Sequence, residues 1–190
     1  MGSSPSRVVV GVTGATGAVY AVRLLERLRA ARRETHLVVS TAGVLNVHHE
    51  LGLDRRALEE MADVAYSPSE VGAPIASGSF VTDAMIVVPC SMKSLAAIAH
   101  GLSDNLLTRA ADVTLKERRP LVLIVRETPL HVGHLRSLAQ LAEMGAIILP
   151  PVPAFYDEPH RISDFVDQIA GRALDLLGYD WPKRKRWNGH

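Results

Sequence analysis

RVVVGVT at Arg7–Thr13, followed by GATG at Gly14–Gly17, is the stretch of sequence that decides the fold. The first segment is a short run rich in valine, which is typical of a strand buried on both faces. The second is a tight turn of small residues, and the segment from Ala18 to Ala31 then repeats its apolar residues at helical spacing. A buried strand that enters a helix through such a turn is the opening unit of a parallel sheet covered by helices.

The same alternation of strand and helix continues along the chain. Short apolar runs predict further strands at 36–40, 84–88, 121–125 and 147–149. Helical spacing predicts helices at 42–51, 55–62, 93–99, 106–117, 133–144 and 162–177. Pro89 is expected to stop its strand, and Asp63 to Thr82 is expected to be mostly loop. In the helix at 133–144 the spacing places four apolar side chains inward: Leu135, Leu138, Leu141 and Ala142.

These elements predict a three-layer, Rossmann-like (flavodoxin-like) α/β fold, with a parallel sheet and helices on both faces. We expect one domain over residues 1–190, in which 1–6 form a flexible leader and 179–190 a C-terminal tail. A chain of 190 residues is long enough for one sizeable core.

Composition excludes several classes of function. The formal net charge of +1 gives no overall field for nucleic acid, and the basic run Lys183–Arg186 is interpreted as a solvated tail. No stretch approaches ~20 apolar residues, so no membrane span is expected. The single cysteine, Cys90, excludes an internal disulfide and suits a reducing cytoplasm. The histidine pairs His48–His49 and His131–His134 lack a third ligand at suitable spacing, so no metal site is predicted.

Ligands of parallel α/β sheets bind beyond the carboxyl ends of the strands. The loops that follow the predicted strands should therefore converge on one candidate site. These loops come after Thr13, Ser40, Pro89, Val125 and Leu149.

The first of these loops has the chemistry of an anion site. Small residues let a ligand approach the backbone, and a helix N-terminus offers N–H groups, so a phosphate is expected near Gly14, Ala15 and Thr16. The glycine spacing differs from G-x-G-x-x-G, and Ser40 stands where a dinucleotide site needs an acidic residue. The pattern favours a mononucleotide over NAD. Ser40 and Thr41 are equally suited to capping the next helix.

Two later loops add hydroxyl, amide and charged groups. Pro89–Ser94 reads PCSMKS and starts a helix, which gives a second place for anionic or carbonyl groups, with Cys90 expected to be packed rather than reactive. Arg126 and Glu127 end a buried strand, where an arginine can bind phosphate bidentately and a carboxylate can move protons. The charged cluster at Lys116–Pro120 has the composition of a solvated helix end.

Taken in order, these motifs resemble the UbiX family of flavin prenyltransferases, within the homo-oligomeric flavin-containing decarboxylase superfamily. The resemblance runs from Arg7 to Gly178. Its markers are VTGATGA at 12–18, SGS at 77–79, PCSMKSL at 89–95, RAADV at 109–113, LKERRPL at 115–121, VRETP at 125–129 and PAFY at 153–156.

The resemblance implies transfer of a dimethylallyl group from dimethylallyl phosphate to N5 and C6 of reduced FMN, without a metal, to make prenylated FMN for a UbiD-type decarboxylase. It implies FMN contacts from Gly14, Ala15, Thr16, Ser40, Ser91, Met92, Lys93, Ser94 and Arg126. It implies substrate contacts from Lys116, Arg126, Tyr156, Arg172 and Trp187. The implied catalytic residues are Glu50, Glu127 and Thr16, where the family usually has serine. It also implies homododecamers with FMN at subunit interfaces.

Two other functions stay open at this point. One is FMN-dependent decarboxylation of a cysteinyl substrate, for which His48 or His49 could act as a base. The other is a noncatalytic flavin carrier or decarboxylase subunit. The cations at Lys116, Arg126 and Arg172 favour a small phosphate co-substrate, and therefore the prenyltransferase.

Overall fold

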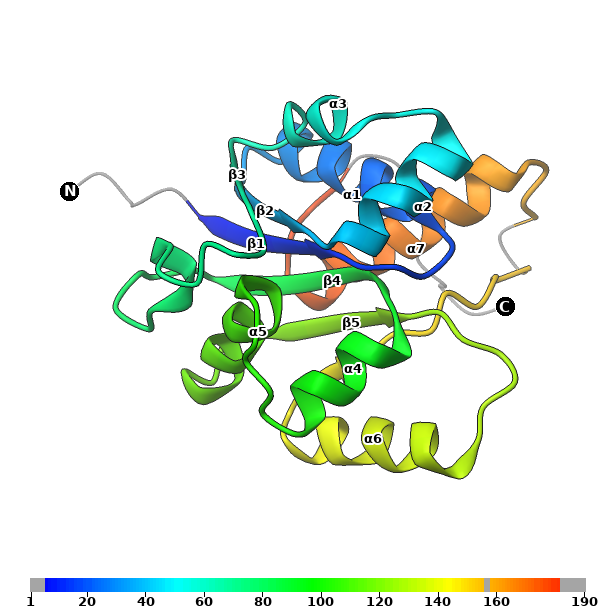
Figure 1. Ribbon diagram of the computed structural model, residues 1–190. Coiled ribbons are helices and arrows are strands. Elements are labelled where there is room, and N and C mark those ends of the chain that lie inside the picture. Colours follow the sequence, from blue (N-terminus) through cyan, green and yellow to red (C-terminus); the bar gives the residue numbers. More distant parts are fainter. Residues whose placement is uncertain (1–5, 156–157, 182–190) are drawn as a thin grey trace.

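Six parallel strands form the centre of the molecule, in a computed structural model that describes residues 6–155 and 158–181 (Figure 1). They are β1 (Arg7–Val12), β2 (Glu34–Val39), β3 (Val64–Tyr66), β4 (Ala84–Cys90), β5 (Leu121–Val125) and β6 (Ile147–Ile148). Their order in the sheet is β3-β2-β1-β4-β5-β6, and every neighbouring pair is parallel. The order reverses direction between β1 and β4, which is where ligands of doubly wound sheets bind.

Helices cover both faces of this sheet, as the sequence predicts (Figure 1). One face carries α1 (Ala18–Ala30), α2 (Thr41–Leu51), α3 (Arg55–Glu59) and α7 (Ile162–Leu176). The other carries α4 (Met92–Ala99), α5 (Leu106–Lys116) and α6 (Val132–Glu143). A short 3-10 helix at Pro74–Ala76 precedes β4.

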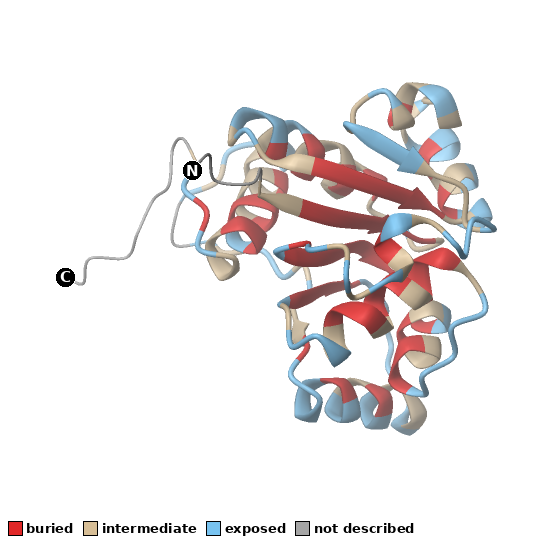
Figure 2. Cartoon of the chain, turned by 90° about the vertical axis from the view of Figure 1, so that its left-hand side faces the viewer, coloured by how far each residue is buried: buried red, intermediate tan, exposed pale blue. Residues whose placement is uncertain are grey.

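Two hydrophobic cores lie on the two faces of the sheet. Side chains of β1 alternate between them, with Val8 and Val10 in the core beneath α1 and α7, and Val9 in the core beneath α4 and α5. Figure 2 shows buried residues along the central strands and exposed residues on the outer sides of the helices. Because both faces of each central strand are buried, these strands are apolar throughout rather than alternating.

The strand predictions need one addition and one correction. The segment 63–82 is mostly loop, as predicted, and it also contains β3, a short edge strand with two exposed residues that the sequence did not predict. Pro89 lies inside β4 instead of ending it. The register between β4 and β5 is irregular from Val87 to Cys90, and such an irregularity tolerates a residue that has no N–H to donate.

The inward face of α6 also differs from the prediction. Leu141 is buried and Leu138 half-buried, but Leu135 and Ala142 are exposed, Leu135 by 52%. The helix packs against α4 and β6 through the side on which Ser137 and Leu141 lie, one turn apart. Leu135 points away from this side, so its apolar surface faces outward.

The two expected chain ends are partly attached to the body. Tyr179, at the start of the expected tail, is buried in the core under α1, and its hydroxyl hydrogen-bonds to Ser6 Oγ at 3.0 Å. The run Lys183–Arg186 lies outside the described residues. Within the described ranges, no helix is long and apolar enough to cross a membrane.

Candidate active site

Thr13 joins the two loops at the point where the strand order reverses. Its hydroxyl donates to the carbonyl oxygen of Pro89 at 2.7 Å and accepts from the backbone N–H of Ser91 at 2.8 Å. The residue is 1% exposed, so water does not compete for these bonds. The loops after β1 and β4 are therefore held as one unit. Sequence reasoning gave Thr13 no role, although a hydroxyl that closes an apolar strand was a usable signal.

The turn after β1 is small because α2 packs directly on it. A Cβ on Gly14 would lie 2.4 Å from the Cβ of Ala42, and a Cβ on Gly43 would lie 2.8 Å from the carbonyl oxygen of Val12. Ser40 caps α2, since its Oγ accepts from the N–H of Gly43 at 3.0 Å. The capping interpretation of Ser40 is confirmed, and Gly14 is required for packing.

Glu50 reaches from the end of α2 to the start of α1. Its carboxylate accepts from the N–H of Gly17 at 3.0 Å and from the N–H of Ala18 at 2.8 Å. The expectation that the N-terminus of α1 offers free N–H groups is wrong for these two residues, because a carboxylate already takes them. A phosphate there would meet the charge of Glu50, which lies at the same helix end as the exposed side chain of Thr16.

The loop after β4 presents its polar groups from the first turn of α4. Ser91 Oγ accepts from the N–H of Ser94 at 3.4 Å and caps the helix, while Lys93 is exposed. Cys90 beneath this loop is fully buried, and burial raises the pKa of its thiol to about 12. A thiol with that pKa is not a nucleophile at neutral pH, which confirms Cys90 as a packed residue.

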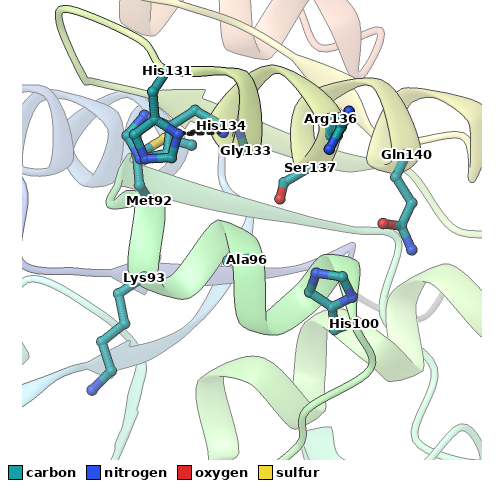
Figure 3. A pocket seen from close by; sticks show the side chains of 10 residues that line it. All are labelled: Met92, Lys93, Ala96, His100, His131, Gly133, His134, Arg136, Ser137 and Gln140. Carbon is teal, nitrogen blue, oxygen red and sulfur yellow. Dashed lines mark hydrogen bonds between the residues drawn. The ribbon is translucent and has the colours of Figure 1, made fainter.

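A groove of about 490 Å³ runs between α4 and α6 beside this loop (Figure 3). His131 and His134 stack at one end, with 3.6 Å between ring centroids, and Lys93 points away from them. His131 Nδ1 accepts from the N–H of Gly133 at 3.0 Å and so caps α6. The groove is lined by Met92, Lys93, Ala96, His100, His131, Gly133, His134, Arg136, Ser137 and Gln140.

The ring of His131 caps the helix. Capping occupies His131 Nδ1 as a hydrogen-bond acceptor, which removes that nitrogen as a ligand. In the part of the chain that the structure describes, no group of three or more His, Cys, Asp or Glu side chains could hold a metal ion.

Arg126 and Glu127 stand at the end of β5, on the same edge as the loops after β1 and β4. The N–H of Arg126 donates to the carbonyl oxygen of Cys90 at 3.3 Å, which ties this loop to the previous one. Burial raises the pKa of Tyr20 in α1, and the positive charge of Arg126 acts in the opposite direction. The guanidinium of Arg126 therefore lies within electrostatic reach of Tyr20, a residue to which the sequence analysis gave no role.

Glu127 is exposed beside Arg126. Its Oε1 accepts from the N–H of Thr128 at 3.0 Å, within its own loop. The carboxylate is therefore held within its own loop at the carboxyl edge of the sheet.

The structure does not bring Lys116 to this edge. Lys116 ends α5, just before β5 begins, and lies against Gly78, shortly before the start of β4. Within one chain it is therefore at the amino edge of the sheet, opposite Arg126. Arg172 is exposed on α7, about 15 Å along the helix axis from its first residue. Tyr156 and Trp187 lie outside the described residues.

Comparison with known proteins agrees with this arrangement of loops. The Flavoprotein family model matches residues 2–173. Flavin prenyltransferase UbiX of Escherichia coli K12 is 50% identical over 186 residues, which cover 96% of this chain and 98% of the relative.

Two solved structures superpose closely. AnUbiX (PadA1), solved with FMN and dimethylallyl pyrophosphate, has a TM-score of 0.96 at 47% identity and covers 98% of this chain and 100% of its own. A dodecameric FMN-dependent UbiX-like decarboxylase from Escherichia coli O157:H7 has a TM-score of 0.94 at 46% identity and covers 96% and 100%. Over nearly its whole length, then, this chain belongs to the UbiX-type flavin prenyltransferase family.

Proposed function

We propose that this protein transfers a dimethylallyl group from dimethylallyl phosphate to N5 and C6 of reduced FMN and releases prenylated FMN. In this reaction the allylic C–O bond breaks, phosphate leaves with the electron pair, and the flavin supplies the electrons for the new bonds. The observation that supports it is the set of coupled loops at the carboxyl edge, where Thr13 binds the loop after β4 and Arg126 stands beside them. This is the position where parallel sheets bind mononucleotides.

The residues at this edge fit FMN as the acceptor. The hydroxyl of Ser40 accepts one hydrogen bond in its cap and keeps its own hydrogen to donate to a flavin or phosphate oxygen. In the turn after β1, Gly14 and Ala15 are half-buried and Thr16 is exposed, so the turn presents small side chains to a ligand. The FMN contacts we propose are Gly14, Ala15, Thr16, Ser40, Ser91, Met92, Lys93, Ser94 and Arg126.

The charged groups divide into two roles. Arg126 can bind a phosphate bidentately and stabilise the negative charge that grows as it leaves. Glu127, next to it, can accept the proton that flavin C6 must lose when the new ring closes. We assign Glu50 and Thr16 to the acceptor side of the reaction, at the start of α1, where Glu50 is already fixed by two backbone N–H groups.

The separation of Lys116 from Arg126 supports a site shared between subunits. Both residues are proposed to hold the donor phosphate, together with Tyr156, Arg172 and Trp187. Within one chain, however, Lys116 and Arg126 lie at opposite edges of the sheet. A second copy of the chain can bring the amino edge of one subunit to the carboxyl edge of another. We therefore propose a homo-oligomer, a dodecamer like the one described for the relative from Escherichia coli O157:H7.

We also propose that the product serves a UbiD-type decarboxylase, in the cytoplasm. Prenylated FMN has no further use in the reaction proposed for this chain, so a second protein has to receive it. This partner is the one that the family resemblance implies.

Anaerobic incubation with reduced FMN and dimethylallyl phosphate tests the proposal, with the flavin mass as the readout. We expect the mass of the flavin to increase by one dimethylallyl group. Glu127→Gln should keep FMN binding but lower the rate of product formation by about 100-fold, because the amide cannot accept a proton. Glu143→Gln, an exposed carboxylate at the end of α6, serves as the matched control and should leave the rate unchanged.

Two results would contradict the proposal at different levels. An unchanged flavin mass with the wild-type protein would overturn the prenyltransferase function. Full turnover by Glu127→Gln would leave that function standing and remove the carboxylate from the proton transfer.

A further inference from the structure

The junction between α5 and β5 carries an ion pair that lies directly over a glycine. Lys116 Nζ donates a hydrogen bond to Glu117 Oε1. A Cβ on Gly78 would lie 2.1 Å from Glu117 Oε1 and 2.9 Å from Lys116 Nζ. Both charged groups therefore lie against the backbone of Gly78, in space that the side chain of any other residue at this position would fill.

Two arginines hold the loop beneath this pair. Arg119 donates to the carbonyl oxygens of Gly78 at 2.7 Å and of Phe80 at 3.0 Å. Arg109 donates to the carbonyl oxygen of Ala76 at 3.1 Å. Charge-assisted bonds of this kind are stronger than neutral ones. These bonds hold the backbone of the loop on which the side chains of Lys116 and Glu117 lie.

The pair places a negative charge beside the cation that is proposed to bind the donor. The hydrogen bond and the positive charge of Lys116 lower the pKa of Glu117, so the carboxylate is ionised at neutral pH. Within one chain the two side chains are 46% and 35% exposed, so the ammonium group is not enclosed by its own subunit. Any anion that binds Lys116 then has the carboxylate of Glu117 as its neighbour.

We infer that Glu117 sets donor specificity by limiting the negative charge that the Lys116 site accepts, so that dimethylallyl phosphate is preferred over the diphosphate. This inference rests on the proposed function. A phosphate monoester carries about two negative charges near neutral pH. The diphosphate adds one more charge, and repulsion from a partly exposed carboxylate nearby disfavours it by a factor of about five.

Comparing the two donors on the same enzyme tests this directly. We would measure kcat and KM for dimethylallyl phosphate and dimethylallyl diphosphate with reduced FMN, and take the ratio of the two kcat/KM values. Glu117→Gln removes the charge and nearly keeps the shape of the side chain. The kcat/KM for the phosphate divided by that for the diphosphate should therefore fall about fivefold, mainly through a lower KM for the diphosphate. Glu117→Asp keeps the charge and should keep the wild-type preference.

A matched control removes a carboxylate from another surface ion pair. Glu60 pairs with Arg56 at 2.8 Å, and Glu60→Gln should leave the donor ratio unchanged. The ratio is independent of the fraction of folded enzyme, because both donors are assayed on one preparation. If Glu117→Gln turns over neither donor, calorimetry with inorganic phosphate and pyrophosphate on the FMN-loaded variant gives the same ratio from binding.

The outcomes separate the inference from the function on which it rests. A wild-type enzyme that prenylates FMN, together with an unchanged or increased donor ratio in Glu117→Gln, would overturn the role of Glu117 alone. A wild-type enzyme that uses neither donor would overturn the prenyltransferase function.

Discussion

His36 shows how one buried side chain ties the stability of this protein to pH. It is 2% exposed in β2, with Nε2 3.0 Å from Glu34 Oε1 and Nδ1 2.9 Å from the hydroxyl of Tyr66 in β3. Burial lowers the pKa of His36, although the hydrogen bond and charge of Glu34 act in the opposite direction. The imidazole is therefore neutral in the folded protein over a wider pH range than in the unfolded chain.

This shift predicts a loss of stability in acid. An unfolded histidine takes up its proton at about pH 6.5, so below that pH the unfolded state binds more protons than the folded state. The melting temperature should fall as the pH is lowered from 7 to 5, and the fall should be smaller in His36→Gln. His100→Gln, at an exposed position, is the control and should follow the wild-type curve. Parallel curves for His36→Gln and the wild type would contradict this assignment.

At the scale of elements, the contact between the turn after β1 and the first turn of α2 decides whether the candidate site forms. The Cβ of Ala42 occupies the space where a side chain on Gly14 would be, so the helix and the turn fit only with glycine at one of these positions.

A pair of exchanged substitutions tests this fit. Gly14→Ala should lower the free energy of unfolding by about 1–3 kcal/mol and weaken FMN binding, because α2 must move away from the turn. The double variant Gly14→Ala/Ala42→Gly removes the clash and should recover most of both losses. Thermal unfolding and FMN titration of the two variants measure the effect. If the double variant were as impaired as Gly14→Ala, the contact would not be the cause.

The elements also show what the sequence can predict. The buried strands β1, β4 and β5 are evident because each is covered on both faces and is therefore apolar throughout. The edge strand β3 is short, mostly exposed and set among turn residues, so it leaves no such pattern. The apolar spacing of α6 does not distinguish the side that packs in the chain from the side on which Leu135 is exposed.

The candidate site, like the fold, can be predicted from the sequence only in part. Its position at the carboxyl ends of the strands is predictable, because it depends only on the order of strands and helices. The bridge made by Thr13 and the cap made by Glu50 join residues far apart in sequence, so no local pattern reveals them. Lys116 is the clearest case, since in the proposed function its partners come from another copy of the chain.

For the whole molecule, the opposite positions of Lys116 and Arg126 predict complementation between inactive variants. Lys116→Ala and Arg126→Ala should each lose activity, but when the two chains assemble together some sites receive both wild-type groups from different subunits. With random mixing about a quarter of the sites should be restored. Prenylation by the co-expressed pair, compared with each variant alone, measures this.

The control for this experiment mixes two variants whose substitutions lie at the same edge of the sheet. Arg126 and Glu127 follow the same strand, so chains with Arg126→Ala and chains with Glu127→Gln cannot supply both groups to one site. This pair should stay as inactive as its components. Equal recovery in both mixtures would argue against a site that spans subunits.

Cys90 gives the whole molecule a further property. The only thiol of the chain is buried at the carboxyl end of β4, and its pKa of about 12 leaves almost none of it as thiolate in the native state. Peroxide, which reduced flavins generate in air, should therefore leave this sulfur intact. An alkylating reagent will modify it only after β4 separates from its neighbours. The rate at which this one sulfur is labelled therefore measures how often the sheet opens.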